Sequence, residues 1–220
     1  MTPCFVVAYL AAGDHASARP NLEAAKAVFE KLLQNHPEEL ANQHRLAICC
    51  RVLADLNGHT GDRDSALGLY QEALRRMKTL AGANPEVPEY HAALAGLHMN
   101  LGELYREQGQ SAAALESFQR ALNILQTLVD EYPKVCRYGR DLAVTLLAIA
   151  AMHSAGGDRQ AALAGLHSAR ELLGRLLRQF PRTEEFNLLL EKATAEIDRL
   201  EAAPPSSSDS RPAKSNASTE

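Results

Sequence analysis

The chain has 220 residues and a formal net charge of −4, from 23 basic and 27 acidic side chains. This mild acidic excess disfavours a nucleic-acid-binding protein, because such proteins normally carry a basic excess. Hydrophobic residues make up 46% of the chain and aromatic residues 5%, with no tryptophan. The composition is that of a folded domain rich in helices. No stretch of sequence approaches the roughly 20 apolar residues of a membrane span.

An internal repeat with a period of 48 residues runs through the sequence. Two columns of residues are typical of helix breaks: Pro37, Pro85, Pro133 and Pro181, and Gly13, Gly61, Gly109 and Gly157. Two columns of small residues keep the same step: Ala18, Ala66, Ala114 and Ala162, and Ala25, Ala73, Ala121 and Ala169. Several independent columns in one register indicate a chain built from repeated supersecondary units.

Each unit is predicted to contain two helices separated by the glycine. In the first unit the chain starts inside the first helix, and Pro20 falls within the expected second helix, where an interior proline costs about 3 kcal/mol. We therefore expect this second helix to begin near Arg19. In the second and fourth units Asp62 and Asp158 follow the glycine and are predicted helix N-caps.

The third unit shows the pattern most clearly. Its first helix carries an apolar face from Leu94 to Tyr105, and Gly109 is expected to break it. Pro133 is expected to end the second helix at or before Tyr132, because proline lacks an N–H and clashes with the preceding turn.

The C-terminal part of the chain is expected to differ from the units. Residues 183–201 predict one amphipathic helix with a largely polar surface, as a solvating cap on a repeat array requires. The residues after it are rich in Pro and Ser, lack an apolar pattern and are expected to be disordered. The predicted organisation is a repeat array over 1–201, with units of about 1–36, 37–84, 85–132 and 133–180 and a cap helix at 183–201, followed by a disordered tail at 204–220.

The third unit resembles the tetratricopeptide repeat (TPR). The residues with the spacing of that pattern are Leu101, Gly102, Tyr105, Gly109, Ala114, Phe118 and Ala121. The familiar TPR repeats every 34 residues, and the extra length here corresponds to about two more helical turns in each helix. The chain is therefore similar to a long-helix TPR variant, such as the repeat regions attached to some bacterial serine/threonine protein kinases and to kinesin light chains. The resemblance implies an all-α, right-handed α-solenoid of helical hairpins with a C-terminal cap helix.

The residues that carry catalysis or bind metals do not form a recognisable motif. His91 and His98 lie seven residues apart on one predicted helix, without a third ligand nearby in sequence. Cys49 and Cys50 are adjacent and no CxxC pair occurs, so we expect reduced cysteines packed as small apolar residues, in a reducing, cytoplasmic compartment. We expect no enzyme activity, no cofactor and no metal.

The resemblance implies that the first helix of each unit lines a concave groove. The residues expected in that groove are His44, Ile48, Arg51, Met99, Glu103, Arg106, Arg140, Val144, Leu147, Lys192 and Arg199. Their apolar members form a strip bordered by basic residues, which suits an extended or helical peptide with apolar anchors and some negative charge. The predicted function is a non-catalytic protein–protein interaction scaffold that binds a protein or peptide segment, with no nucleic-acid or membrane partner.

Two other hypotheses about the role of this chain remain open. The incomplete first unit is compatible with a C-terminal repeat region or fragment of a serine/threonine kinase-like signalling protein. The N-terminal end also carries no polar cap, so the chain is a candidate for self-association, with Phe5, Val6, Tyr9 and Leu10 meeting a second copy.

Overall fold

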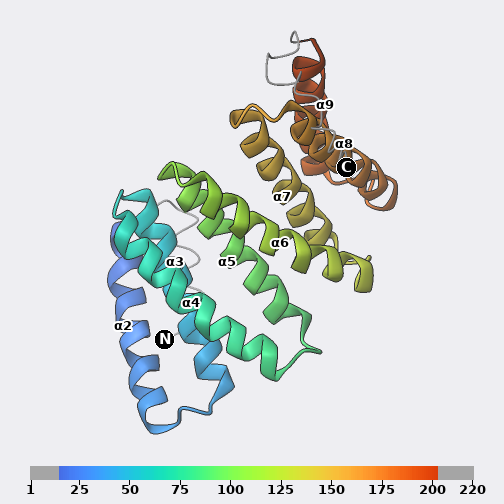
Figure 1. Ribbon diagram of the computed structural model, residues 1–220. Coiled ribbons are helices and arrows are strands. Elements are labelled where there is room, and N and C mark those ends of the chain that lie inside the picture. Colours follow the sequence, from blue (N-terminus) through green and yellow to red (C-terminus); the bar gives the residue numbers. More distant parts are fainter. Residues whose placement is uncertain (1–14, 203–220) are drawn as a thin grey trace, which may run out of the picture. The chain divides into compact units, whose positions relative to one another are not determined.

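The computed structural model describes residues 15–202, and every regular element among them is an α-helix (Figure 1). The helices are α2 (His15–Asn35), α3 (Leu40–His59), α4 (Arg63–Ala83), α5 (Pro88–Glu107), α6 (Ser111–Glu131), α7 (Cys136–Ala155), α8 (Arg159–Gln179) and α9 (Glu184–Ala202). Their first residues recur at the 48-residue period of the sequence. The predictions for Phe5, Val6, Tyr9 and Leu10 and for the tail at 204–220 lie outside the described residues.

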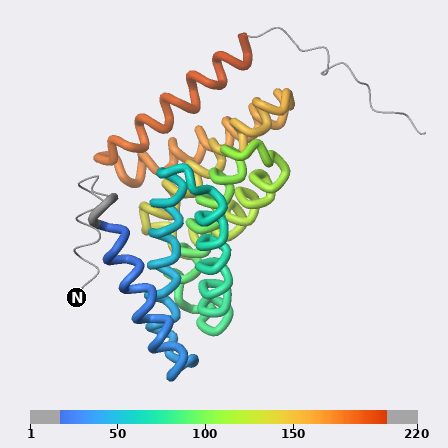
Figure 2. The backbone as a smooth tube through the Cα atoms, turned by 90° about the vertical axis from the view of Figure 1, so that its left-hand side faces the viewer, coloured from blue at the N-terminus to red at the C-terminus, as the bar shows by residue number. Residues whose placement is uncertain are grey.

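The chain forms two compact units that divide after Tyr138. Unit 1 holds α2 to α6 and the first residues of α7, and unit 2 holds the rest of α7 with α8 and α9. In unit 1 each helix packs on the next in chain order, from α2 through α6, and Figure 2 shows these helices running alternately up and down. In unit 2 α8 packs on α9. The fold is an all-α solenoid of helical hairpins.

The turn inside each hairpin has the same geometry at three places. Gly61, Gly109 and Gly157 adopt φ values of 85°, 71° and 79°, a left-handed conformation that favours glycine. The amide that follows each glycine donates to the carbonyl five residues back: Asp62 to Asn57, Gln110 to Tyr105 and Asp158 to His153, at 2.9, 2.8 and 2.9 Å. This is the Schellman arrangement, which satisfies the last carbonyls of a helix. The predicted helix breaks at these glycines are confirmed.

The residue after each of these glycines is the N-cap of the second helix of the hairpin. The Asp62 carboxylate accepts a hydrogen bond from the Ser65 amide, and the Asp158 carboxylate accepts one from the Ala161 amide. Both side chains therefore satisfy an amide that the first helical turn leaves without a partner, which confirms the two predicted N-caps. The second helix of the third unit ends at Glu131, as Pro133 predicts.

The small residues of the repeat lie where the two helices of a hairpin touch. Ala25 is half-buried, and the other seven alanines of the two columns are fully buried: Ala18, Ala66, Ala73, Ala114, Ala121, Ala162 and Ala169. Gly102 on α5 lies at a contact too close even for alanine, because a Cβ placed there would lie 2.6 Å from Cε1 of the buried Phe118 ring on α6. Helix contact at this distance needs residues without side-chain bulk, so the alanine and glycine columns set how closely the helices pack.

The beginning of α2 differs from the prediction. The helix starts at His15 instead of near Arg19, and Pro20 lies inside it. A proline in the second turn removes one intrahelical hydrogen bond. Ala18 and Leu22 are buried against Leu53 and Leu56 of α3, and this burial of apolar surface offsets the loss.

One buried polar residue of unit 1 stands in an otherwise apolar column. His98 on α5 is 3% exposed, and Cys50 and Leu146 hold the equivalent positions of the neighbouring units. Burial, with the nearby positive charges of Arg120 and Lys78, lowers the pKa of His98 to about 4. This histidine is therefore neutral at physiological pH.

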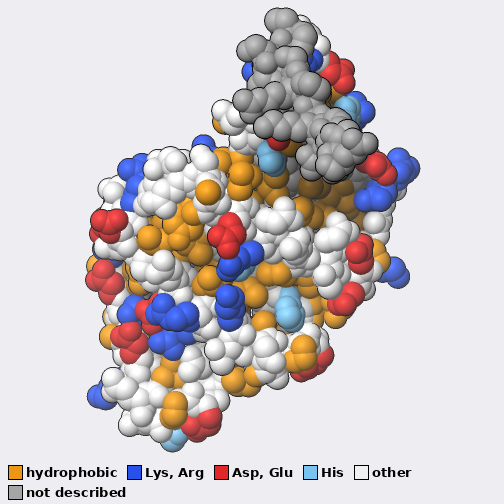
Figure 3. All heavy atoms as spheres, in the orientation of Figure 1, with side chains coloured by type: hydrophobic (Ala, Val, Ile, Leu, Met, Phe, Trp, Pro, Cys, Tyr) orange, Lys and Arg blue, Asp and Glu red, His pale blue; other side chains and the backbone are white. Residues whose placement is uncertain are grey.

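The outer surface of the helices carries charges of both signs. Figure 3 shows Lys and Arg interspersed with Asp and Glu over the face in view. In the described part of the chain no helix is sufficiently long and apolar to cross a membrane.

We predict that Gly102→Ala destabilises unit 1 while Gly96→Ala on the same helix does not. A methyl group at 102 meets the Phe118 ring, and overpacking of this kind costs about 1–3 kcal/mol. A methyl group at 96 meets no atom within 4 Å, so the better helix propensity of alanine gains up to about 1 kcal/mol. Urea unfolding of both variants measures the two effects. Equal stability of the two variants would contradict the packing role of Gly102.

We also predict that His98 makes unit 1 sensitive to acid. Because its pKa in the folded chain lies below the ordinary 6.5, its contribution to stability is present above pH 6.5 and lost as the pH falls toward about 4. The loss amounts to about 3 kcal/mol at most. The variant His98→Leu, which introduces the residue found at the equivalent position 146, should not show this loss of stability at low pH. The control variant His91→Gln on the same helix should still show it. The measurement is urea unfolding at pH 7 and pH 4, and an identical acid response of the wild-type and His98→Leu chains would refute the assignment.

Candidate functional site

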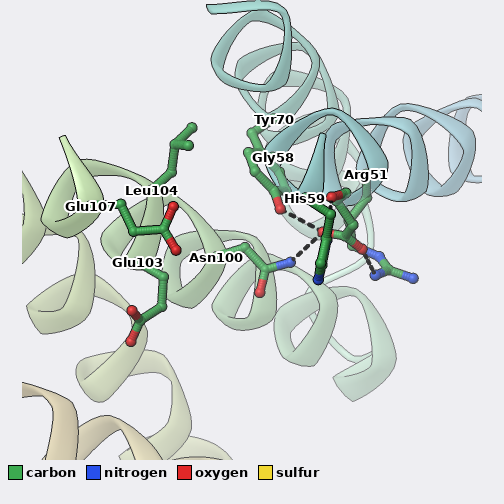
Figure 4. Close-up of a pocket in the computed structure, with 9 residues that line it drawn as sticks. Arg51, Gly58, His59, Tyr70, Asn100, Glu103, Leu104 and Glu107 are labelled. Carbon is green, nitrogen blue, oxygen red and sulfur yellow. Dashed lines mark hydrogen bonds and ion pairs between the residues drawn. The ribbon is translucent and has the colours of Figure 1, made fainter. Parts of the chain in front are cut away.

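A hollow of about 470 Å³ opens among α3, α4 and α5 of unit 1. This volume falls in the range of side-chain and small-ligand pockets. Figure 4 shows the side chains that line it, most of them polar. The lining residues are Arg51, Asp55, Gly58, His59, Tyr70, Asn100, Glu103, Leu104 and Glu107.

The Asp55 carboxylate ties the three helices together at this hollow. Its Oδ1 accepts hydrogen bonds from the Tyr70 hydroxyl of α4 at 2.5 Å and from the Asn100 amide of α5 at 3.0 Å. Its Oδ2 accepts one from the Arg51 guanidinium at 2.9 Å. In Figure 4 the Tyr70 and Asn100 side chains point toward one another from different helices, and dashed lines mark their hydrogen bonds. We call these four residues the Asp55 hub.

The hub holds the Asp55 carboxylate in a site that is partly shielded from solvent. The Asp55 side chain is 28% exposed. Burial raises the pKa of Asp55, and the Tyr70 hydrogen bond and the Arg51 charge oppose that rise without cancelling it. Burial, followed by the Asp55 charge, raises the pKa of Tyr70 as well. Tyr70 is therefore a permanent donor to Asp55 at physiological pH.

Two further carboxylates line the hollow on α5. Glu103 pairs with Arg106 at 2.7 Å and Glu107 pairs with Arg63 at 3.8 Å. Both carboxylates are exposed, at 48% and 45%. Exposed pairs of this kind contribute about 0–1 kcal/mol each. The lining thus holds three carboxylates against the one guanidinium of Arg51, which Asp55 already neutralises.

The predicted groove residues of unit 1 fall on one stripe of α3 and one of α5. Ile48 and Arg51 are one turn apart on α3, and Ile48 is 40% exposed. Met99, Glu103 and Arg106 follow helical spacing on α5. We call these five residues the α3/α5 stripe. Arg51 and Glu103 also line the hollow, so the structure brings the two helices of the stripe together there.

His44, a predicted groove residue, takes part in the packing of α3 against α5. Its ring packs edge-on against the Tyr90 ring of α5, with centroids 5.2 Å apart. Burial lowers the pKa of His44. This contact joins α3 to α5 near the start of both helices, and the Asn100–Asp55 bond joins them farther along.

The predicted residues of unit 2 lie on α7 and α9. Arg140 pairs with Asp141 at 2.8 Å and with Glu185 of α9 at 3.9 Å, Val144 is half-buried and Lys192 is exposed. Arg199 pairs with Glu196. Leu147 is 8% exposed and packs in the core with Leu166 and Ile197, so it offers little surface to a partner.

Most of the residues that line the hollow lie outside the predicted groove set, which includes only Arg51 and Glu103 of them. Tyr70, Asn100, His59 and Glu107 are not among the predicted groove residues. One signal was available: Arg51 and Asp55 stand four residues apart, and Glu103 and Arg106 three apart, which are the spacings of intrahelical ion pairs. Those spacings indicate that the arginines are neutralised within the chain and do not form a free basic border.

Among the described residues no group of three His, Cys, Asp or Glu side chains is gathered to hold a metal ion. Cys49, Cys50 and Cys136 are free thiols, and Cys49 and Cys50 are buried. Burial raises the pKa of Cys50 to about 12, which keeps it a thiol at physiological pH. The fourth cysteine, Cys4, lies outside the described residues.

Two sequence-family models match unit 1, and both describe the tetratricopeptide repeat. One matches residues 46–86, which begin within α3 and run through α4, and the other matches residues 95–127 of α5 and α6. The chain is a TPR-like repeat protein. The similarity to kinase-attached repeat regions is not confirmed by these matches and stays a prediction.

Several solved structures align with most of this chain at low sequence identity. The yeast histone chaperone Hif1, described as a scaffold protein recruiting protein complexes to core histones, aligns over 86% of this chain and 98% of its own, with 11% identity and a TM-score of 0.53. MamA aligns over 89% of both chains, with 14% identity and a TM-score of 0.39. BtubC from P. vanneervenii covers 94% of this chain and 97% of its own at 16% identity and a TM-score of 0.37. No curated protein sequence matches the chain.

We predict that Tyr70→Phe destabilises unit 1 by about 1–3 kcal/mol at pH 7, because Asp55 loses a donor while it remains largely buried. Asp55 has a raised pKa, so its contribution to stability is greatest below the ordinary value of 3.8 and is lost as the pH rises through its folded-state pKa. The variant raises that pKa further, and its cost is therefore smaller near pH 3 than at pH 7.

Urea unfolding at both pH values measures this cost. The matched control is Tyr70→Phe in an Asp55→Asn chain, where the acceptor is neutral and the loss is smaller. An equal loss in both backgrounds would show that the hydroxyl does not act through the Asp55 carboxylate.

Proposed function

We propose that this TPR-like chain is a non-catalytic protein-interaction scaffold that holds a segment of a protein partner on the α3/α5 stripe. The observation that carries this proposal is the exposure of Ile48 on α3, one turn before Arg51, which lines the hollow between α3 and α5. A large apolar side chain that is 40% exposed gives a partner contact area, and the hollow farther along the same helix gives it a place to anchor.

The packing of unit 1 supports a preformed surface. The His44–Tyr90 contact and the Asn100–Asp55 hydrogen bond hold α3 and α5 at two points along their length. Side chains on the stripe therefore project from rigid helices, and a partner that binds there pays little to order them. Helical-repeat proteins use such surfaces for binding, and the Hif1 description as a scaffold agrees with this function.

The accessible residues of α7 and α9 are proposed as a second contact surface, in unit 2. Val144 is half-buried and Lys192 is exposed, at the positions that correspond to Ile48 in the repeat. The partner of this surface is again a protein segment, and Arg140 and Arg199 lie on the same helices.

We predict that Ile48→Asp together with Met99→Glu weakens partner binding at least tenfold, because it places charge on the apolar part of the stripe. The probes are twelve-residue peptides selected from a random display library on the purified chain, and titration calorimetry measures their affinity. A tenfold loss corresponds to about 1.4 kcal/mol.

The matched control is Val28→Asp on α2, where an apolar side chain is 56% exposed away from the stripe. The control is expected to bind the selected peptides as the wild-type chain does. Peptides that bind the stripe variant and the wild-type chain equally well would remove the proposed function.

A further inference from the structure

We propose that the hollow among α3, α4 and α5 receives one arginine side chain of the partner segment. This inference rests on the proposed function, because the arginine belongs to a segment that lies on the α3/α5 stripe. It also reverses the charge expected from the sequence alone, which favoured a partner with some negative charge.

The first argument is the charge of the lining. Arg51 is the cation that lines the hollow beside His59, and its guanidinium donates to Asp55. Glu103 and Glu107 add two exposed carboxylates on successive turns of α5. An incoming anion would meet these carboxylates, whereas an incoming cation is attracted by them.

The second argument is the availability of acceptors. Asp55 accepts from three donors of its own chain, so the hub is satisfied and serves as the floor of the hollow. Glu103 and Glu107 have solvent-exposed partners on the rim, Arg106 and Arg63. Exposed pairs are weak, so both carboxylates can exchange those partners for a guanidinium that enters the hollow.

The third argument is shape. Gly58 leaves the α3 wall without a side chain, and the His59 ring stands beside it, held by a 2.6 Å contact between Nδ1 and the Asp55 carbonyl. Figure 4 shows this ring facing the hollow from α3, with Glu103 and Glu107 on α5 opposite. A flat ring and paired carboxylates suit the planar, forked donor set of arginine better than the compact ammonium of lysine.

The test uses the display-selected peptides on the full chain. We expect the selected peptides to share an arginine. Replacing it by citrulline, which keeps the shape and removes the charge, should weaken binding about tenfold. Glu103→Gln with Glu107→Gln should weaken the arginine peptide by a similar factor and leave the citrulline peptide unchanged, so that the two peptides bind the variant alike.

The control is Glu116→Gln on α6, an exposed carboxylate paired with Arg120 outside the hollow. It should bind both peptides as the wild-type chain does. The side-chain amide resonance of Asn100 reports locally, because this group lines the hollow and should shift with the arginine peptide more than with the citrulline peptide.

The outcomes separate the two proposals. Peptides that need Ile48 and Met99 but bind equally well with citrulline, or that contain no arginine, overturn the arginine pocket and leave the proposed function standing. Peptides that bind independently of Ile48 and Met99 but lose affinity in the Glu103/Glu107 variant support the arginine pocket and overturn the apolar residues of the stripe as a binding surface. Peptides that are insensitive to both sets of variants overturn both.

Discussion

The close contact between the paired helices is the constraint on which the rest of the structure depends. Seven alanines of the two repeat columns have no exposed surface, and Gly102 lies against the Phe118 ring where a methyl group would not fit. Small residues at these positions let the two helices approach closely, and a larger side chain there would force the pair apart. The Schellman turns at the glycines then only need to reverse the chain within a few residues.

This constraint also explains why the fold could be predicted from the sequence. The requirement for small residues recurs in every repeat, so it appears in the sequence as columns with a fixed period, and the helix starts in the structure keep the same period. The exception, the start of α2 before Pro20, arises because burial of Ala18 and Leu22 outweighs one lost hydrogen bond. Local propensity alone does not contain that tertiary contribution.

The residues of the candidate site, by contrast, do not recur from repeat to repeat, and for this reason the site could not be predicted from the repeat columns. The Tyr70 hydroxyl and the Asn100 amide, which donate to Asp55, have no counterparts in the later repeats. One repeat later the same three positions hold Glu103, Phe118 and Ala148, without a hydroxyl or an amide. A comparison of equivalent positions across the repeats shows only what recurs, so it does not single out such residues. Only the structure shows that three single deviations, on three helices, meet at one carboxylate.

The hub is therefore a local feature imposed on a periodic scaffold. In the columns of later repeats Ala151, Leu166 and Glu196 take the three positions, so those columns do not supply the same three bonds. A partly buried carboxylate with a raised pKa costs free energy at physiological pH. Packing does not require that cost, because Phe118 and Leu166 bury well in the column of Tyr70. What the hub adds is a fixed distance between α3 and α5 at the point where the hollow opens. A surface that must present a shaped hollow needs such a fixed distance, and a surface that only faces solvent does not.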